Sequence, residues 1–287
     1  KQILSYASIP VLVQPNAGLP EMVDGQTVYP MKPDTFERYT SIMVQQGVRL
    51  VGGCCGTTPE FIKAVRKAVD GLTPVTTSVN RPTAVSSGSR TVVLGEGVKV
   101  IGARINARLN EDIANALKSN NLGDLVSEAI DQRSRGADIL AVNVGLPDMV
   151  DDKMTERELL PSVIREIQAV VNLPLEISSS CPDALEAAMR MYNGKPLVRW
   201  DARGKDSMKS LLPLVKKYGA CIVVPVMDEE MPVNPVDRLK SIEDIVHYIR
   251  SYGIPAEDII LDCGASSVET HPGKSMETIE TIRLIKN

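Results

Sequence analysis

The chain has 287 residues, enough for one large barrel or for two smaller domains. A hydrophobic share of 43% with 24% charged residues is typical of a globular enzyme. The net charge of -4 argues against nucleic acid and anionic membranes as partners, and no apolar run approaches the roughly 20 residues of a membrane span.

The first residue and the cysteine content bear on where the protein works. The chain begins with Lys1 rather than Met, so we expect it to be processed or cut from a longer protein. No charged-then-apolar signal segment follows. Five cysteines, an odd number without disulfide-scaffold spacing, favour a reducing compartment, and the predicted location is the cytoplasm.

The first 71 residues predict two strand–helix units. A short β-branched strand is expected at Val11–Val13, and a helix at Pro33–Gln46 with Gly47 just past its end. A second strand is expected at Val48–Val51, and a second helix from Pro59 to about Asp70.

A polar stretch from Leu72 to Gly97 follows these units. It is rich in serine and threonine, contains Pro74 and Pro82, and has neither helical nor strand periodicity. We therefore predict that residues 72–97 form an inter-domain linker, with the strands on its two sides in different sheets.

From residue 98 onward a strand–helix pattern repeats six times. The predicted strands are Val98–Gly102, Asp138–Val144, Leu175–Ser178, Leu197–Trp200, Ala220–Val226 and Asp258–Asp262. Several are apolar at nearly every position, as expected when both faces are buried. The alternation predicts a parallel sheet, and polar or glycine residues after the strands are typical of the active-site end of a (β/α)₈ barrel.

The predicted fold class is α/β, with two incomplete TIM-type (β/α)₈ barrel segments joined by the linker. Residues 1–71 would supply the closing units of one barrel, and residues 98–287 the first six units of another. Two further strands are expected beyond Asn287. An open doubly wound sheet is the alternative, although no Gly-x-Gly-x-x-Gly follows a strand. A single hybrid barrel of two plus six units is a weaker alternative because the linker is long.

Adjacent Cys54 and Cys55 follow the second predicted strand, flanked by glycines that let both thiols turn inward. Three interpretations are open: two buried apolar cysteines, a strained vicinal disulfide, or two thiolate ligands of Zn²⁺. A zinc site needs at least a third protein ligand from elsewhere.

Three motifs surround this pair: PNAGLP at 15–20, YP at 29–30 and GGCCGTTP at 52–59. They resemble the end of the homocysteine-binding barrel of the cobalamin-dependent methionine synthase family, over roughly residues 10–71. The resemblance implies that Cys54 and Cys55 bind zinc, that a third cysteine well upstream and absent from this chain completes the site, and that Asn16 contributes to substrate binding. Zinc would hold the homocysteine sulfur as a thiolate, its nucleophilic form.

Four motifs in the second segment are IGARIN at 101–106, ADILAVNVG at 137–145, YNGKP at 192–196 and LD at 261–262. They resemble the methyltetrahydrofolate barrel that follows in the same family. This pterin-binding barrel is shared with dihydropteroate synthase and the methyltetrahydrofolate:corrinoid methyltransferases. The resemblance implies a methyltransferase that uses methyltetrahydrofolate as donor, cobalamin on a separate domain or protein, and homocysteine as acceptor.

The expected pterin site departs from the family pattern at four positions. Where the family has Glu, Asp, Asp and Asn, this chain has Ala103, Ala141, Ser178 and Arg199. The expected type is kept at Asn106, Asn143 and Asp262. Losing one partner of a buried charged hydrogen bond costs about 2–5 kcal/mol, so we expect ordinary folate binding to be reduced to little or nothing.

Two interpretations of this barrel stay open. It holds a different ligand, such as an anion attracted by Arg104, Arg199 and Arg203, or it is a non-catalytic scaffold that positions a corrinoid domain or another partner. No catalytic side chain is assigned. The candidate substrate-binding residues are Asn16, Arg104, Asn106, Asn143, Arg199 and Asp262, and the candidate metal ligands are Cys54 and Cys55.

Overall fold

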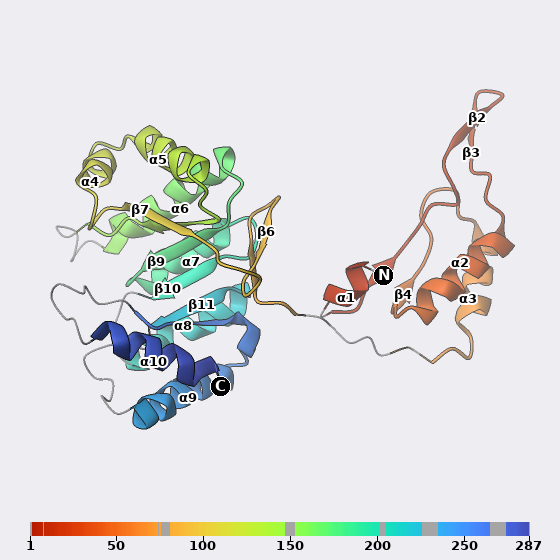
Figure 1. Cartoon of the computed structure of the whole chain (residues 1–287). Coiled ribbons are helices and arrows are strands. Elements are labelled where there is room, and N and C mark those ends of the chain that lie inside the picture. The colour runs from red at the N-terminus through yellow and green to blue at the C-terminus, as the bar shows by residue number, and fades with distance from the viewer. Residues whose placement is uncertain are drawn as a thin grey trace. The chain divides into compact units, whose positions relative to one another are not determined.

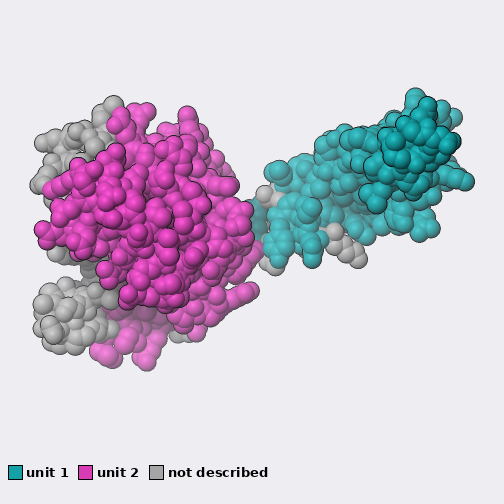
Figure 2. All heavy atoms as spheres, turned by 90° about the horizontal axis from the view of Figure 1, so that it is seen from above, with its two compact units in different colours: residues 1–81 teal, residues 82–287 magenta. Residues whose placement is uncertain are grey.

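The computed structural model describes residues 2–7, 9–73, 75, 81–146, 153–200, 205–225, 235–264 and 274–286. The chain divides into two compact units, residues 1–81 and residues 82–287, which are coloured separately in Figure 2. Each unit has sheets and a core of its own. Within the described ranges, no helix is long and apolar enough to cross a membrane.

The first unit contains both predicted strand–helix pairs. Its elements are α1 (Gln2–Tyr6), β1 (Leu12–Val13), β2 (Glu21–Val23), β3 (Gln26–Val28), α2 (Pro33–Gln45), β4 (Leu50–Val51) and α3 (Pro59–Val69). Strands β1 and β4 pair in parallel, and an antiparallel hairpin of β2 and β3, which was not predicted, stands between β1 and α2. Proline begins α2 and α3, where its fixed φ suits the first turn.

A small aromatic core holds the two helices of this unit together. Phe36 of α2 and Phe61 of α3 meet edge to face, with ring centroids 5.4 Å apart. Ala17 and Val65 are buried in the same cluster. Because Ala17 follows β1 closely, this core also fixes the loop at the carboxyl end of that strand.

The second unit is an α/β layer structure built on six parallel strands (Figure 1). Its elements are β5 (Ala84–Ser86), β6 (Thr91–Val93), β7 (Ile101–Asn106), α4 (Glu111–Lys118), α5 (Leu122–Ser134), β8 (Ile139–Asn143), α6 (Lys153–Val170), β9 (Leu175–Ser179), α7 (Pro182–Met191), β10 (Leu197–Trp200), α8 (Lys205–Tyr218), β11 (Cys221–Pro225), α9 (Pro235–Ser251), a 3₁₀ turn (Ala256–Asp258), β12 (Ile259–Asp262) and α10 (Lys274–Lys286). The sheet order runs consecutively from β7 to β12. The predicted parallel sheet of six strands is confirmed.

The position of the first strand of this sheet differs from the prediction. It spans Ile101–Asn106 rather than Val98–Gly102, and Val98 is 92% exposed. The pairing with β8 shifts register between Gly102 and Ile105, so a bulge carries the strand past the glycine at which the apolar run was expected to end.

Side chains of the six strands alternate between two faces. On the outer face, residues such as Leu140, Ile177 and Val224 belong to the large core that includes the helices. On the inner face, Ile139 and Val223 form a second apolar cluster. Both faces are therefore buried along β8, β9, β10 and β11, which explains the continuous apolar runs in the sequence.

The hairpin of β5 and β6 covers part of this inner face. Val85 is fully buried in the inner cluster, and Val92 is 5% exposed there. Ser86 exchanges two backbone hydrogen bonds with Lys195, the residue two positions before β10, at 2.9 and 3.0 Å. The Tyr192 hydroxyl donates to the Ser86 carbonyl at 3.0 Å. The hairpin thus closes the amino-terminal end of the sheet's inner face.

The hairpin corrects the predicted linker of residues 72–97. The boundary between the units falls between Arg81 and Pro82, and residues 84–93 belong to the second unit. Each hairpin strand is only three residues long and buries one valine, so no periodicity could be detected in the sequence. The predicted separation of sheets is confirmed, because β4 pairs with β1 whereas β7 pairs with β8.

We expect Val85→Ala to destabilise the second unit by about 2 kcal/mol, because it removes two buried methyl groups and leaves a cavity. Val98→Ala is the matched control, since this valine is 92% exposed and its truncation should cost less than about 0.5 kcal/mol. Urea unfolding of both variants measures the difference. Equal effects would mean that the hairpin is not part of the cooperative core.

Candidate functional site

A cavity of about 490 Å³ lies at the carboxyl ends of β7, β8, β9 and β10. It is lined by Ile101, Ala103, Ile105, Asn106, Arg108, Leu109, Ala141, Asn143, Glu176, Ser178 and Arg199. Period-two alternation brings most of these residues onto the inner face of the sheet. The structure thus brings together three predicted substrate-binding residues, Asn106, Asn143 and Arg199, with the alanines that replace expected acids.

Two of these residues end neighbouring strands at the same level. Asn106 of β7 and Asn143 of β8 are register partners. The Asn106 side-chain oxygen accepts the Arg108 amide at 3.0 Å, and the Asn143 side-chain oxygen accepts the Gly145 amide at 3.0 Å. Each asparagine therefore fixes the turn that follows its own strand.

Arg199 lies between two carboxylates that come from different strands. Its Nε donates to Glu176 Oε1 of β9 at 2.8 Å, and its Nη1 donates to Asp262 Oδ2 of β12 at 2.6 Å. The Glu176 side chain is only 4% exposed. Glu176 was not predicted as a site residue. Its place two positions before Ser178, on the same face of β9, is the sequence signal that could have found it.

These ion pairs favour the charged forms of Arg199 and Asp262. Burial works to lower the pKa of Arg199, but Glu176 and Asp262 outweigh it and raise this pKa. Burial likewise works to raise the pKa of Asp262, yet the hydrogen bonds from Arg199 and from the Gly264 amide lower it overall. One guanidinium thus faces two carboxylates, so Arg199 gives the cavity no excess positive charge for an anionic ligand.

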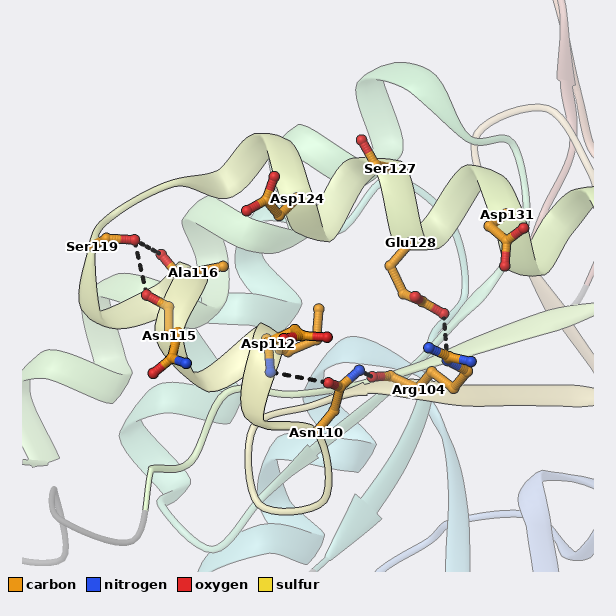
Figure 3. A pocket seen from close by; sticks show the side chains of 11 residues that line it. Arg104, Asn110, Asp112, Asn115, Ala116, Ser119, Asp124, Ser127, Glu128 and Asp131 are labelled. Atoms are coloured by element: carbon orange, nitrogen blue, oxygen red, sulfur yellow. Dashed lines mark hydrogen bonds and ion pairs between the residues drawn. The ribbon is translucent and has the colours of Figure 1, made fainter.

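Arg104 requires a correction, because the structure does not group it with these residues. It follows Ala103 on β7 and so points to the opposite face, where its Nε contacts Glu128 Oε1 of α5 at 3.0 Å (Figure 3). There it borders a separate cavity of about 560 Å³ between β7, α4 and α5, with Asp112 and Asp131 among the lining residues. Arg203, the third predicted arginine, lies outside the described residues.

The cysteine pair is exposed and is not joined by a disulfide. The Sγ atoms of Cys54 and Cys55 are 3.8 Å apart, and both cysteines are free. A disulfide would need about 2.05 Å, whereas two thiolates bound tetrahedrally at 2.3 Å from one Zn²⁺ lie about 3.8 Å apart. The spacing therefore fits two ligands of one zinc ion. In the part of the chain that the structure describes, no three His, Cys, Asp or Glu side chains cluster closely enough to hold a metal.

The loop after β1 holds the backbone of this pair. The Asn16 side-chain oxygen accepts the Cys55 amide at 3.2 Å, and the Pro15 carbonyl accepts the Cys54 amide at 3.0 Å. The Ala17 amide donates to the Cys55 carbonyl at 2.9 Å. Asn16 therefore positions a candidate metal ligand.

Tyr29, from the YP motif at residues 29–30, lies beside the same two cysteines. Gly56 has φ +77°, and a Cβ there would lie 2.2 Å from Cγ of Tyr29, so only glycine lets the ring approach. Desolvation, followed by the effect of the Cys55 and Cys54 thiols, raises the pKa of Tyr29. All three motifs of the first unit thus meet around the two thiols.

We expect acid unfolding to depend on Asp262, whose pKa is lowered in the folded protein. A lowered pKa gives stability that is full above the unfolded value of about 3.9 and is lost as the pH falls through the folded value. Asp262→Asn should therefore flatten the decline in unfolding free energy below about pH 4, and Arg199→Met should act in the same direction. Urea unfolding across this range is the measurement. An unchanged acid slope in both variants would contradict the role of this ion pair.

Comparison with known proteins gives two family matches. Residues 102–287 match the pterin binding enzyme family, and residues 1–69 match the homocysteine S-methyltransferase family. The methionine synthases of Mycobacterium leprae (strain TN) and Mycobacterium tuberculosis are each 29% identical across 100% of this chain. The chain spans 25% of the length of each of these relatives.

Solved structures show the same fold for most of the chain. The dihydropteroate synthase of Vibrio fischeri ES114 has a TM-score of 0.53 at 13% identity, covering 71% of this chain and 75% of that one. The dihydropteroate synthase of Xanthomonas albilineans has a TM-score of 0.51 at 16% identity, covering 71% of each chain. The six-stranded parallel sheet is therefore part of a TIM-barrel-like arrangement, and at these identities the likeness concerns the fold alone.

Proposed function

The chain belongs to the pterin binding enzyme family, and on this basis we propose that it forms part of a methyltransferase that moves a methyl group from methyltetrahydrofolate through cobalamin to homocysteine. One observation carries the proposal: motifs of a homocysteine S-methyltransferase meet around two free thiols in a chain that also holds a pterin-type cavity. The match of the whole chain to one quarter of the methionine synthases supports this order of units. Cobalamin would be carried by a separate domain or protein.

In the first unit, Cys54 and Cys55 would hold the zinc ion. When bound, zinc stabilises a thiolate near neutral pH, which is the nucleophile that homocysteine must present. The residues of this chain fix the geometry: Asn16 and Pro15 hold the cysteine backbone, and Tyr29 packs beside the thiols. The third protein ligand is proposed to come from outside this chain.

We expect the chain by itself to bind zinc weakly, because two thiolates leave a tetrahedral site without the third ligand it needs. Zinc content measured by mass spectrometry after dialysis against a mild chelator should be far below one ion per chain. Cys54→Ser with Cys55→Ser is the matched control, and it should lower the residual zinc further. Stoichiometric zinc after dialysis would contradict the weak-binding expectation.

In the second unit we propose a degraded folate site. The donor groups of a pterin ring need carboxylate or amide acceptors at the strand ends, but Ala103 and Ala141 offer none and Ser178 offers a short neutral one. Asp262, which keeps the expected type, is already engaged by Arg199 at 2.6 Å. Asn106 and Asn143 would be left to position the ring from one side.

Methyltetrahydrofolate should therefore bind much more weakly than to an intact site, because each unmet buried polar group costs about 1–3 kcal/mol. Calorimetry on the protein is the test, and restoring Ala141→Asp and Ser178→Asp together should recover measurable affinity. Micromolar or tighter binding to the native chain would remove the degraded-site proposal.

A second candidate function is a non-catalytic scaffold or interaction module, or a methyltransferase for a different donor. It is favoured by the Arg199 ion pairs, because Arg199 already occupies the carboxylates of Glu176 and Asp262 that could accept hydrogen bonds from a folate. Methyl transfer from methyltetrahydrofolate by the native protein would decide against it. Homocysteine and a corrinoid-binding domain are the proposed partners, and the cytoplasmic location stays a prediction.

A further inference from the structure

We propose that Arg199 is an internal ligand of the second unit: its guanidinium occupies a receptor for planar guanidine-type donors that Glu176 and Asp262 form. The inference deepens the proposed function, since it concerns the same cavity. The receptor itself is inferred only from the positions of these three side chains. Only the choice of pterin as a competing ligand rests on the proposed function.

Glu176 belongs to β9 and Asp262 to β12, and the sheet order places β10 and β11 between these strands. The two carboxylates therefore converge from separate strands on the space over the inner face of β10. Two different nitrogens of Arg199, Nε and Nη1, meet one carboxylate oxygen each, at 2.8 and 2.6 Å. The two carboxylates are thus spaced to accept N–H donors from two different nitrogens of one planar group.

A pterin ring contains a carbon atom bonded to three nitrogens, two of them ring atoms and one an amino group, with the same planar donor edge as guanidinium. Carboxylates accept charge-assisted hydrogen bonds from the N–H donors of such a group. Arg199 and a pterin would therefore compete for Glu176 and Asp262. Because Arg199 is tethered to β10, its effective concentration is at least in the millimolar range, and it has the advantage over a dilute ligand.

The cavity beside Arg199 leaves room for a ligand larger than guanidinium. The cavity of about 490 Å³ extends from Arg199 toward β7 and β8, where Ala103 and Ala141 present only methyl groups. Removing the Arg199 side chain would join its volume to this cavity. A small planar cation could then reach both carboxylates, and a larger ring could extend over the alanines.

Chemical rescue tests the receptor directly. Arg199→Ala should lower the Tm, because two carboxylates lose a charged partner. About 10 mM guanidinium chloride should then raise the Tm of this variant by about 3 °C, corresponding to roughly a tenfold shift of the folding equilibrium. The same concentration of tetramethylammonium chloride, a cation without N–H donors, should have no such effect. The native chain should respond by less than about 1 °C.

A matched control separates a receptor from a simple ion pair. The Arg90 guanidinium contacts one carboxylate, that of Asp138, at 3.2 Å. Arg90→Ala should therefore not be rescued by guanidinium at this concentration. If Arg199→Ala does not fold, Arg199→Met keeps the packing of the aliphatic stem and takes its place. Rescue that is absent in the foldable Arg199 variant, or equal in the Arg90 variant, would overturn the proposal.

Pterin itself is the second probe, followed by its intrinsic fluorescence. The foldable Arg199 variant should bind pterin at least about tenfold more tightly than the native chain, since the internal competitor is gone. If guanidinium rescues the variant but pterin does not bind, the receptor proposal stands. The proposal that pterin is a ligand of this cavity is then contradicted.

Discussion

The alternation of side chains along parallel strands, interrupted by the bulge in β7, is the constraint on which the second unit depends. Because β8 to β11 are buried on both faces, a side chain there points either toward the helices or toward the inner face. Ala141 and Asn143 of β8 and Glu176 and Ser178 of β9 thus line one cavity, although their neighbours in sequence belong to the outer core. The same rule sends Arg104 away from that cavity, to Glu128 on α5. A one-residue shift in any strand would exchange the two sets.

Much of this arrangement could be predicted from the sequence. The apolar runs gave five of the six sheet strands to within a residue or two at each end, because strands buried on both faces carry a strong and continuous signal. The cysteine pair could also be placed at the end of a strand, since glycines and a following proline mark the turn there. The motif-bearing loops of the first unit meet around that pair.

Other features could not be predicted, for physical reasons. The hairpin at residues 84–93 is stabilised by residues far along the chain, so its own short sequence resembles a polar linker. The charge of Arg199 is balanced by Glu176 and Asp262, and such pairing depends on which strands are neighbours rather than on local sequence. The sequence-based expectation of a positively charged cavity that attracts an anion through Arg199 is therefore not supported. The bulge after Gly102 likewise depends on pairing with β8.

The hairpin has a consequence for the order in which the protein folds during synthesis. The Ser86 carbonyl is bonded by Tyr192, 106 residues later, and the Ala84 carbonyl by the Cys221 thiol, 137 residues later. Ribosomes add roughly 5–20 residues per second, so several seconds separate the emergence of the hairpin from that of its partners. During that interval Val85 and Val92 have no finished core to enter. The nascent chain must therefore keep two unpaired strand edges in solution, where a chaperone that binds short apolar extended segments could bind.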